Sequence, residues 1–562
     1  MNPPESSPIP DLEAIAQRPF LGRLAAYSKL CGPGWLQGAI TLGSGSLAGA
    51  LYLGIIMGYH MLWLQPLAMI LGVVMLSAIA YVTLSTGQRP FASINRHVSP
   101  ILGWAWLLAT IMANLVWALP QFSLGTAALT QNLIPALSNS TTGGKFAAGL
   151  CLFAVSYAVV WFSASGTRGI AAFETILKTM VALIVVSFFG VVLAMANQLP
   201  WKEIFAGFVP DFSLLTAPAP GFAAAIEATS ENAASWRALI VEDQKDKMIA
   251  AFATAVGINM TFLLPYSMLR KGWGKPHRGL AIFDLATGLI VPFVLATGCI
   301  VIASASRFHT QTADVLEGNA VRPEMAGAYQ KVVDTFLKVH HGSGVFGGMA
   351  PEDRQQLRQG LPEADRTLAA MLANRDAFNL ASALTPLTGK AFSQWIFGLG
   401  VLGMAVSTII VLMLINGYAV CEIAGLPPQG PPFLMAALLP GLTGCLAPFL
   451  WTGGDAQAAI AVPASVIAGA LLPIAYFTFF LLMNSRALLG PNAPSGAKRV
   501  LWNVVMTVAA CVAAAASVWV LRTKMLGAFP IGKLAIVLLA LLAVGGLIGF
   551  LRRSRQQDPN KV

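Results

Sequence analysis

The sequence predicts an all-α protein that crosses a membrane many times. Of its 562 residues, 56% are hydrophobic and only 10% are charged, and the mean hydropathy is +0.70. Twelve apolar windows are each long enough to cross about 30 Å of hydrocarbon as a helix. Two of these windows are interrupted by residues that propagate a helix poorly. Together these observations predict a polytopic helical bundle that contains broken helices.

The predicted spans lie at residues 33–60, 61–88, 101–131, 146–163, 169–196, 247–268, 279–304, 392–416, 432–450, 459–484, 500–521 and 531–552. An even number of spans puts both termini on one side of the membrane. The short segments on that side are rich in basic residues, among them Arg89, Arg168, Lys275, Arg486 and Arg553. Because such residues favour the cytoplasmic side, we expect a multi-pass protein of the plasma membrane, or of the inner membrane in a bacterium, with both termini cytoplasmic. The net charge of +11 follows from this bias and does not indicate nucleic-acid binding.

The first and sixth spans contain the most informative residues. Four consecutive small residues interrupt span 1, namely Gly43, Ser44, Gly45 and Ser46. Gly257, Asn259, Thr261 and Pro265 together predict a second break in span 6. Discontinuous helices five spans apart are what a five-plus-five inverted repeat requires, and such breaks mark binding sites. The alternative is that these small residues only allow close helix packing.

The two breaks suggest a division of the chain. We expect a cytoplasmic N-terminal arm at 1–30, a first repeat of spans 1–5 at 31–197, and an extracellular loop at 198–246. A second repeat of spans 6–10 follows at 247–490 and contains an extracellular insertion at 305–388. Residues 491–562 hold spans 11 and 12 and a cytoplasmic tail. Most acidic residues of the chain fall in the two external segments.

The composition around the first break points to the chemistry of the site. No Asp or Glu occurs between Glu13 and Glu174, so the break lacks the carboxylate that a hard or borderline metal cation needs. Half-helices that start at a break offer free N–H groups and a positive dipole end, which favour a small anion. We predict a substrate site formed by Gly43, Ser44, Gly45, Ser46, Gly257, Asn259, Thr261 and Phe262. No Lys or Arg lies near either break, so the site is expected to bind an anion with a single charge. Bicarbonate is the leading candidate, and a neutral polar solute is the alternative.

Several stretches resemble the Nramp family of divalent-metal transporters. Span 1, with Gly32-Pro33-Gly34, then the break and Gly58-Tyr59-His60-Met61-Leu62-Trp63, is similar to the family's first span. Similarity extends to the end of span 10, Leu472-Pro473-Ile474-Ala475 followed by Met483-Asn484-Ser485-Arg486, and to span 8, Gly400 to Glu422. The resemblance implies a LeuT-like fold with the site between spans 1 and 6. Ser407 and Thr408 resemble the adjacent hydroxyls that complete a sodium site in such folds; packing is the alternative reading.

The chain departs from the family at the residues that would bind a metal. Where the family has Asp-Pro-Gly-Asn in span 1, this chain has Gly43 to Ser46. Where the family has Met-Pro-His-Asn in span 6, the ungapped match is Thr261-Phe262-Leu263-Leu264, without thioether or histidine. Span 3 offers Asn114, Gln121 and Ser123 in place of acidic residues. We therefore expect no metal site.

These features predict a secondary transporter of a small monovalent anion, with Na⁺ as a candidate coupling ion and no other cofactor. The alternatives are a divalent-metal transporter with an altered site and a non-transporting sensor. An enzyme is not expected, because a serine nucleophile needs a base and all six histidines fall at span ends or in loops. The expected partners are a small inorganic ion and membrane lipid, without nucleic acid, and we expect a monomer. Glu174 and Lys178, four residues apart in span 5, are predicted to pair with each other.

Overall fold

Long apolar runs form helices here because, in hydrocarbon, each backbone polar group must find its partner within its own helix. The computed structural model describes residues 15, 17–134, 142–318, 320–389, 392–447, 456–525 and 529–556. Residues 1–14 and 16 of the predicted N-terminal arm, and 557–562 of the predicted tail, lie outside this description. The helices of the apolar bundle are α3 (Pro33–Thr41), α4 (Ser44–Met57), α5 (Leu64–Thr86), α7 (Pro100–Ala127), α8 (Thr142–Ala164), α9 (Gly166–Met195), α12 (Ala233–Ala253), α13 (Ile258–Arg270), α14 (Arg278–Leu285), α15 (Val291–Phe308), α21 (Phe397–Ile423), α22 (Gly430–Cys445), α24 (Ala456–Met483), α26 (Gly496–Leu521) and α27 (Ile531–Gln556).

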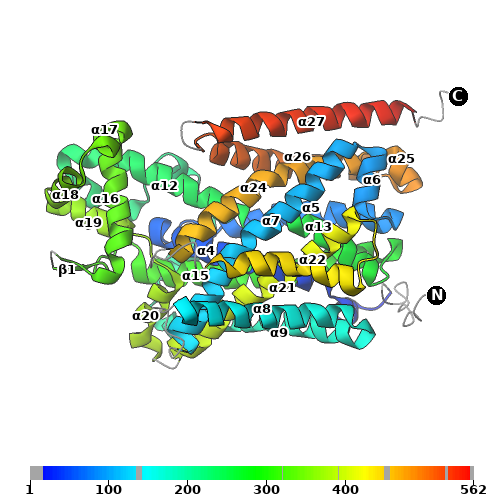
Figure 1. Ribbon diagram of the computed structural model, residues 1–562, viewed down its shortest axis with the longest axis horizontal. Helices are drawn as coiled ribbons and strands as arrows, with labels where there is room; N and C mark the ends of the chain where they lie inside the picture. The colour runs from blue at the N-terminus through cyan, green and yellow to red at the C-terminus, as the bar shows by residue number, and fades with distance from the viewer. Residues whose placement is uncertain are drawn as a thin grey trace.

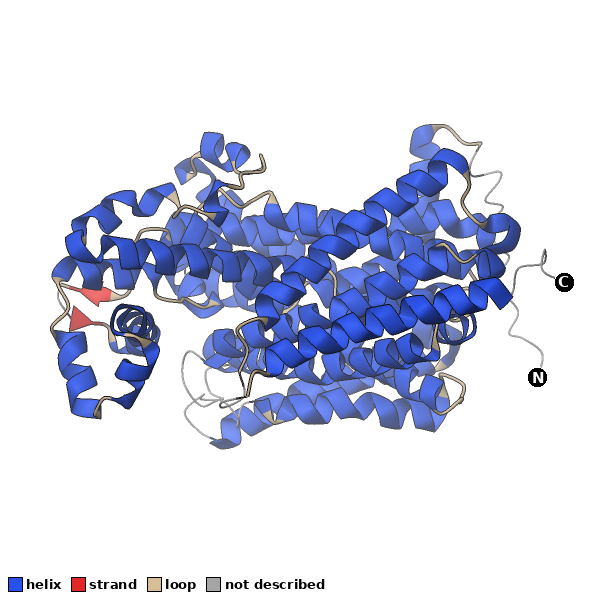
Figure 2. Cartoon of the chain, turned by 90° about the horizontal axis from the view of Figure 1, so that it is seen from above, coloured by secondary structure: helices blue, strands red, loops and turns tan. Residues whose placement is uncertain are grey.

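Shorter elements connect and cover the bundle. Connecting helices are α2 (Phe20–Leu30), α6 (Pro90–His97), α10 (Trp201–Ala206), α11 (Ala223–Ala228) and α25 (Arg486–Leu489). The insertion predicted at 305–388 folds into α16 (Ala326–His341), α17 (Ser343–Gly348), α18 (Pro351–Gln359), α19 (Glu363–Leu372) and α20 (Ala377–Thr388), with an antiparallel pair of two-residue strands, β1 (Leu316–Glu317) and β2 (Ala320–Val321). We call α16–α19 together with β1 and β2 the cap. It stands at one end of the bundle, and the strand pair is visible in Figure 2.

The all-α polytopic prediction is confirmed. Among the described residues, nine helices are long and apolar enough to cross a membrane, and two bent helix pairs raise the number to eleven. The shorter apolar helix α22 falls in the remaining predicted window. Each of the twelve windows therefore contains a helix. The helix of the sixth window starts earlier than predicted, since α12 begins at Ala233 and extends beyond the apolar stretch.

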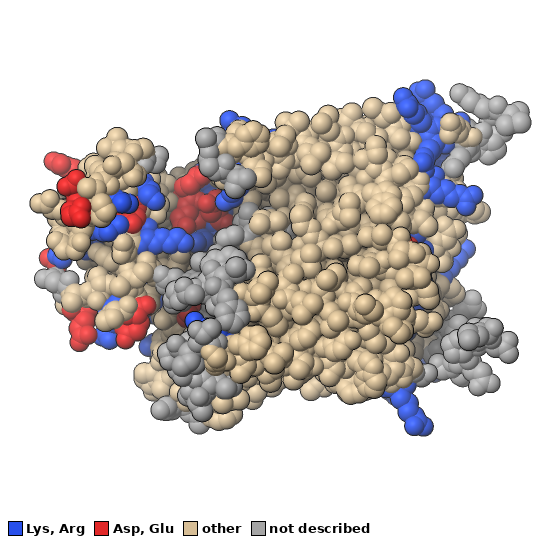
Figure 3. All heavy atoms as spheres, viewed as in Figure 1, with Lys and Arg blue, Asp and Glu red and all other residues tan. Residues whose placement is uncertain are grey.

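Charge is distributed unevenly along the bundle. Figure 1 marks both chain ends on the right and places the cap on the left. Figure 3 shows Lys and Arg with almost no Asp or Glu at the right end, a mixture of basic and acidic residues on the left, and a belt almost free of charged residues between the two ends. Such a belt is what a protein in contact with hydrocarbon presents, and the basic end is the one expected to face the cytoplasm.

This arrangement predicts opposite accessibility for two positions. In a variant without native cysteines, a single cysteine at Lys275, between α13 and α14, is expected to react with a membrane-impermeant maleimide only from the cytoplasmic side. A single cysteine at Glu352 in α18 is expected to react only from outside. Labelling of intact cells and of inverted vesicles checks this, and reaction of both positions from outside would contradict the predicted topology.

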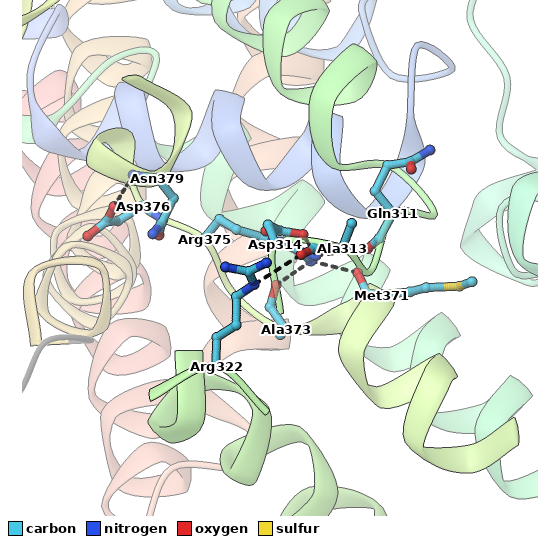
Figure 4. Close-up of polar contacts among 9 residues, drawn as sticks. All are labelled: Gln311, Ala313, Asp314, Arg322, Met371, Ala373, Arg375, Asp376 and Asn379. Carbon is cyan, nitrogen blue, oxygen red and sulfur yellow. Dashed lines mark hydrogen bonds and ion pairs between the residues drawn. The ribbon is translucent and has the colours of Figure 1, made fainter. Parts of the chain in front are cut away.

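A buried ion pair joins the two chain segments that connect the cap to the bundle. Arg375, whose side chain is fully buried, forms a two-point ion pair with Asp314, with Nε to Oδ2 at 2.8 Å. Its remaining N–H groups donate to the carbonyls of Gln311, Met371 and Ala373, as Figure 4 shows. Because a buried guanidinium is costly unless its donors are used, this network fixes the segment before α20 against the chain that leaves α15.

A second buried charge joins the cap to α12. The carboxylate of Asp365 in α19 accepts hydrogen bonds from Asn232 Nδ2 and from Trp236 Nε1, the latter at 2.6 Å. Trp236 also stacks on Phe336 of α16 with ring centroids 4.3 Å apart. The cap is thus held to the outer end of the helix that enters span 6.

Candidate functional site

The first half of span 1 ends at Thr41 and the second begins at Ser44, with their axes bent by 57°. The predicted break therefore lies at Leu42 and Gly43, and Ser44 to Ser46 form the first turn of α4. Gly43 is the N-cap and has no side chain to cap that turn. The Ser46 hydroxyl donates to Gly43 O at 2.9 Å and accepts from Gly43 N at 3.1 Å. Of the first-turn N–H groups, that of Ser44 donates to Gln121 Oε1, which leaves those of Gly45 and Ser46 for a ligand.

The sixth span is also broken, next to the break in the first. The chain leaves helical geometry from Thr254 to Gly257 and resumes at Ile258. Gly257 is again an N-cap without a side chain. The Met260 Sδ accepts from Gly257 N and from the Thr41 hydroxyl, both at 3.3 Å, so it joins the two breaks. The prediction that no thioether lies at the second break is wrong, because this break is earlier than the ungapped match assumed.

A cavity of about 20 Å³ lies between the breaks, enough for about one water molecule. Its lining consists of Ile40, Thr41, Gly43, Ser44, Gly45, Ser46, Trp117, Pro120, Gln121 and Thr254, none of them charged. Gln121 of α7 accepts a hydrogen bond from Ser44 N at 2.9 Å. The buried Ser44 hydroxyl has no hydrogen-bond partner among the described residues. Because an unpaired buried hydroxyl costs about 1–3 kcal/mol, a polar ligand in this cavity would relieve that cost.

A second group of oxygens lies beside this cavity. Ser407 Oγ of α21 donates to Ala39 O at 2.9 Å. Thr408 Oγ1 lies 3.4 Å from the carbonyls of Ala39 and Ile40 and 3.5 Å from that of Leu42. All five groups are buried, and the carbonyls belong to the C-terminal end of α3, which carries the negative end of its dipole. A small cation is the ligand that such converging oxygens favour.

The predicted substrate residues do not all meet. Gly43 to Ser46 line the cavity. Gly257 and Asn259 lie at the second break, where Asn259 Nδ2 donates to Asn114 Oδ1 at 3.3 Å. The Thr261 hydroxyl instead accepts from Trp106 Nε1 at 2.9 Å, and Phe262 packs on the same indole with centroids 5.2 Å apart. Thr261 and Phe262 therefore position α13 against α7 and are not part of the cavity wall.

Six wall residues were not among the predicted site residues: Ile40, Thr41, Trp117, Pro120, Gln121 and Thr254. For Pro120 and Gln121 the sequence did contain a signal, because a Pro-Gln pair lies in the middle of an apolar span without acidic residues. Trp117 is held by its indole N–H, which donates to Ala464 O at 3.0 Å. Nothing in the sequence near Trp117 distinguishes it from an ordinary packing tryptophan.

The ion pair predicted within span 5 does not form. Glu174 Oε2 lies 3.1 Å from Lys271 Nζ, while Lys178 Nζ donates to Cys31 O at 2.9 Å. Both lysines thus hold the start of span 1. Among the described residues, no group of three or more His, Cys, Asp and Glu side chains is placed to bind a metal ion.

The sequence matches the family described as natural resistance-associated macrophage protein-like over residues 34–332 and 366–523. The chain belongs to the Nramp family. No curated protein matches it.

Solved structures with the same fold come from the manganese transporter of Eremococcus coleocola. Its complex with an aromatic bis-isothiourea compound superimposes with a TM-score of 0.63 at 13% identity, covering 96% of both chains. A histidine-to-alanine mutant gives a TM-score of 0.64 at 13% identity, covering 96% of this chain and 97% of the other. The LeuT-like fold with broken spans 1 and 6 is thereby confirmed for this Nramp protein.

Proposed function

We propose that this Nramp protein is a secondary transporter that carries a small monovalent oxyanion, such as bicarbonate, through the site between the two helix breaks. The observation that supports this most directly is the cavity wall, which contains no charged residue. Both half-helices begin at a glycine N-cap, so their positive ends face the break, where neutral side chains bind only some of the N–H groups: Gln121 accepts from Ser44 N and Asn259 from Met260 N. The unpaired Ser44 hydroxyl adds a neutral donor.

Sodium coupling is the second part of the proposal. The oxygens of Ser407 and Thr408 face the carbonyl end of α3, whereas the anion would contact the start of α4. A cation and an anion on opposite sides of one break would stabilise each other electrostatically. Binding of one is therefore expected to raise the affinity for the other, which is the requirement for coupled transport.

A divalent metal ion is the second candidate substrate, and two findings favour it. The similar solved structures are of a manganese transporter. In addition, the Met260 Sδ lies at the second break, within reach of the Thr41 hydroxyl. A thioether is a soft ligand that suits some transition metals, whereas hard and borderline ions favour carboxylates, carbonyls, water or imidazoles. The cavity wall contains no carboxylate and no imidazole, so a metal ion there would meet only neutral oxygens.

Uptake by purified protein in liposomes separates these possibilities. We expect wild-type protein to accumulate labelled bicarbonate, with faster uptake under an inward sodium gradient, and to show no uptake of Mn²⁺ above that of protein-free liposomes. Accumulation of Mn²⁺ in the liposomes, or micromolar Mn²⁺ binding measured by calorimetry, would contradict the anion proposal and identify the metal ion as the substrate. Absence of uptake for bicarbonate, Mn²⁺ and a neutral solute would favour a sensor.

A further inference from the structure

Asp284 of α14 is a buried carboxylate that the proposed substrate site does not use. Only 1% of the residue is exposed. Its Oδ2 accepts from Gly34 N at 2.6 Å and its Oδ1 from Gly32 N at 3.1 Å. Gly32 is the N-cap of α3, so the carboxylate caps the positive end of this half-helix. Among the described residues of the membrane helices, it is the one fully buried acidic side chain.

Beside this cap, the backbone of α3 touches that of α14 and of the π-helical turn that follows it, Ala286–Ile290. A Cβ atom added at Gly34 would lie 2.1 Å from Asp284 O, and one at Gly38 would lie 2.4 Å from Gly288 O. A Cβ at Gly288 would lie 2.6 Å from Trp35 N. Because no side chain separates the two segments, α3 can remain docked only in this one position, and the carboxylate lies at the end of the contact.

Two lysines hold the same segment from the other side. Lys178 Nζ of α9 donates to Cys31 O at 2.9 Å, and Lys271 Nζ lies 3.4 Å from that oxygen. Lys271 is in turn held by Glu174 at 3.1 Å. The carboxylate thus binds the N–H groups of residues 32–34, while the ammonium groups bind the carbonyl just before them.

The far end of α3 lies at the proposed ion site. The helix has nine residues, which at about 1.5 Å per residue makes it roughly 13 Å long. Its terminal carbonyls face Ser407 and Thr408. A movement of α3 away from α14 would therefore displace these carbonyls and open a path from the break toward the side of the membrane that carries the N-terminus.

We propose that Asp284 is a positioning residue that holds α3 closed, and that making and breaking its two hydrogen bonds gates access to the ion site from the N-terminal side. The gate serves the proposed transport function, but closure of α3 is independent of which ion is carried. Asp284→Asn is the most specific substitution, because the amide keeps the shape of the carboxylate. Its oxygen can accept from one of the two N–H groups, of Gly32 or Gly34, while its NH₂ faces the other.

The test uses a variant in which Cys31, whose side chain hydrogen-bonds to Asp284, is replaced by Ser and the other native cysteines by Ala, with one reporter cysteine at Ser44, in sealed vesicles of known orientation and without substrate. An impermeant maleimide is added on the side that carries the N-terminus. We expect Asp284→Asn to raise the labelling rate at least about tenfold over the reporter parent, the factor that corresponds to about 1.4 kcal/mol. If that variant does not fold, Asp284→Ser carries the test, since the shorter neutral side chain cannot hold both Gly32 N and Gly34 N, and the same rise in labelling rate is expected.

Asp365→Asn is the matched control, because it neutralises another fully buried carboxylate, in the cap. Its labelling rate is expected to stay within twofold of the parent. Labelling of folded Asp284→Asn at the parental rate, or an equal rise in Asp365→Asn, would overturn the gating role. Since no substrate is present, failure of bicarbonate transport in liposomes would leave this result unaffected, and the two proposals can fail separately.

Discussion

Replacing Ser46 by Asp is expected to abolish anion transport while preserving the fold. Ser46 is the third residue of α4 and is 1% exposed. An acidic residue in a first turn favours the helix, which offsets part of the cost of burying its charge, and thermal unfolding of the purified variant measures whether the fold is kept. In the cavity, however, two like charges about 4 Å apart repel by roughly 4 kcal/mol at an effective dielectric constant of about 20. The affinity for a monovalent anion should therefore fall by between two and three orders of magnitude.

Ser46→Asn is the control for this variant, because it has nearly the same size and no charge. We expect bicarbonate uptake in liposomes to be lost in Ser46→Asp and retained at a measurable rate in Ser46→Asn. These two variants also test whether the substrate is a divalent metal ion, because an added carboxylate would strengthen the binding of such a cation. Calorimetry that finds tighter Mn²⁺ binding to Ser46→Asp, with Mn²⁺ uptake already present in the wild type, would contradict the anion proposal.

The second large effect is expected at the oxygens that face the end of α3. Replacing Ser407 and Thr408 together by Ala removes two ligand oxygens and leaves the carbonyls of Ala39 and Ile40 in place. We expect the sodium concentration for half-maximal uptake to rise at least about tenfold, because each interaction of a hydroxyl with a charged group contributes about 1.5–3 kcal/mol. The measurement is the initial rate of bicarbonate uptake as a function of sodium.

A matched double variant, Thr297→Ala with Thr478→Ala, removes two equally buried hydroxyls. Both donate only to carbonyls of their own helices, at 2.7 Å and 2.6 Å. Its sodium dependence should remain that of the wild type, while its stability shows what the loss of two buried hydroxyls costs. Uptake that never depended on sodium, or an equal shift in this control, would remove the coupling role of Ser407 and Thr408.

Part of the candidate site follows from local sequence. Four small residues at 43–46 predict a break in span 1. The helix is interrupted at Leu42 and at Gly43, the first of these four residues. Local sequence does not fix the position of the break in the sixth span, because several poor helix formers share that span. The structure breaks at Thr254 to Gly257, so Thr261 and Phe262 fall on the continuous part of α13 and contact Trp106.

By itself, the sequence determined the class of the protein, its twelve apolar windows and the absence of acidic residues beside the first break. These properties depend on composition and helix propensity, which act along the chain. Only the tertiary structure decided which polar groups meet. Lys178 is near Glu174 along its helix, yet it donates to Cys31 O; Gln121 binds Ser44 N; Asp284 caps α3 from another helix. Such partners depend on how helices distant in sequence cross, and no local pattern specifies that geometry.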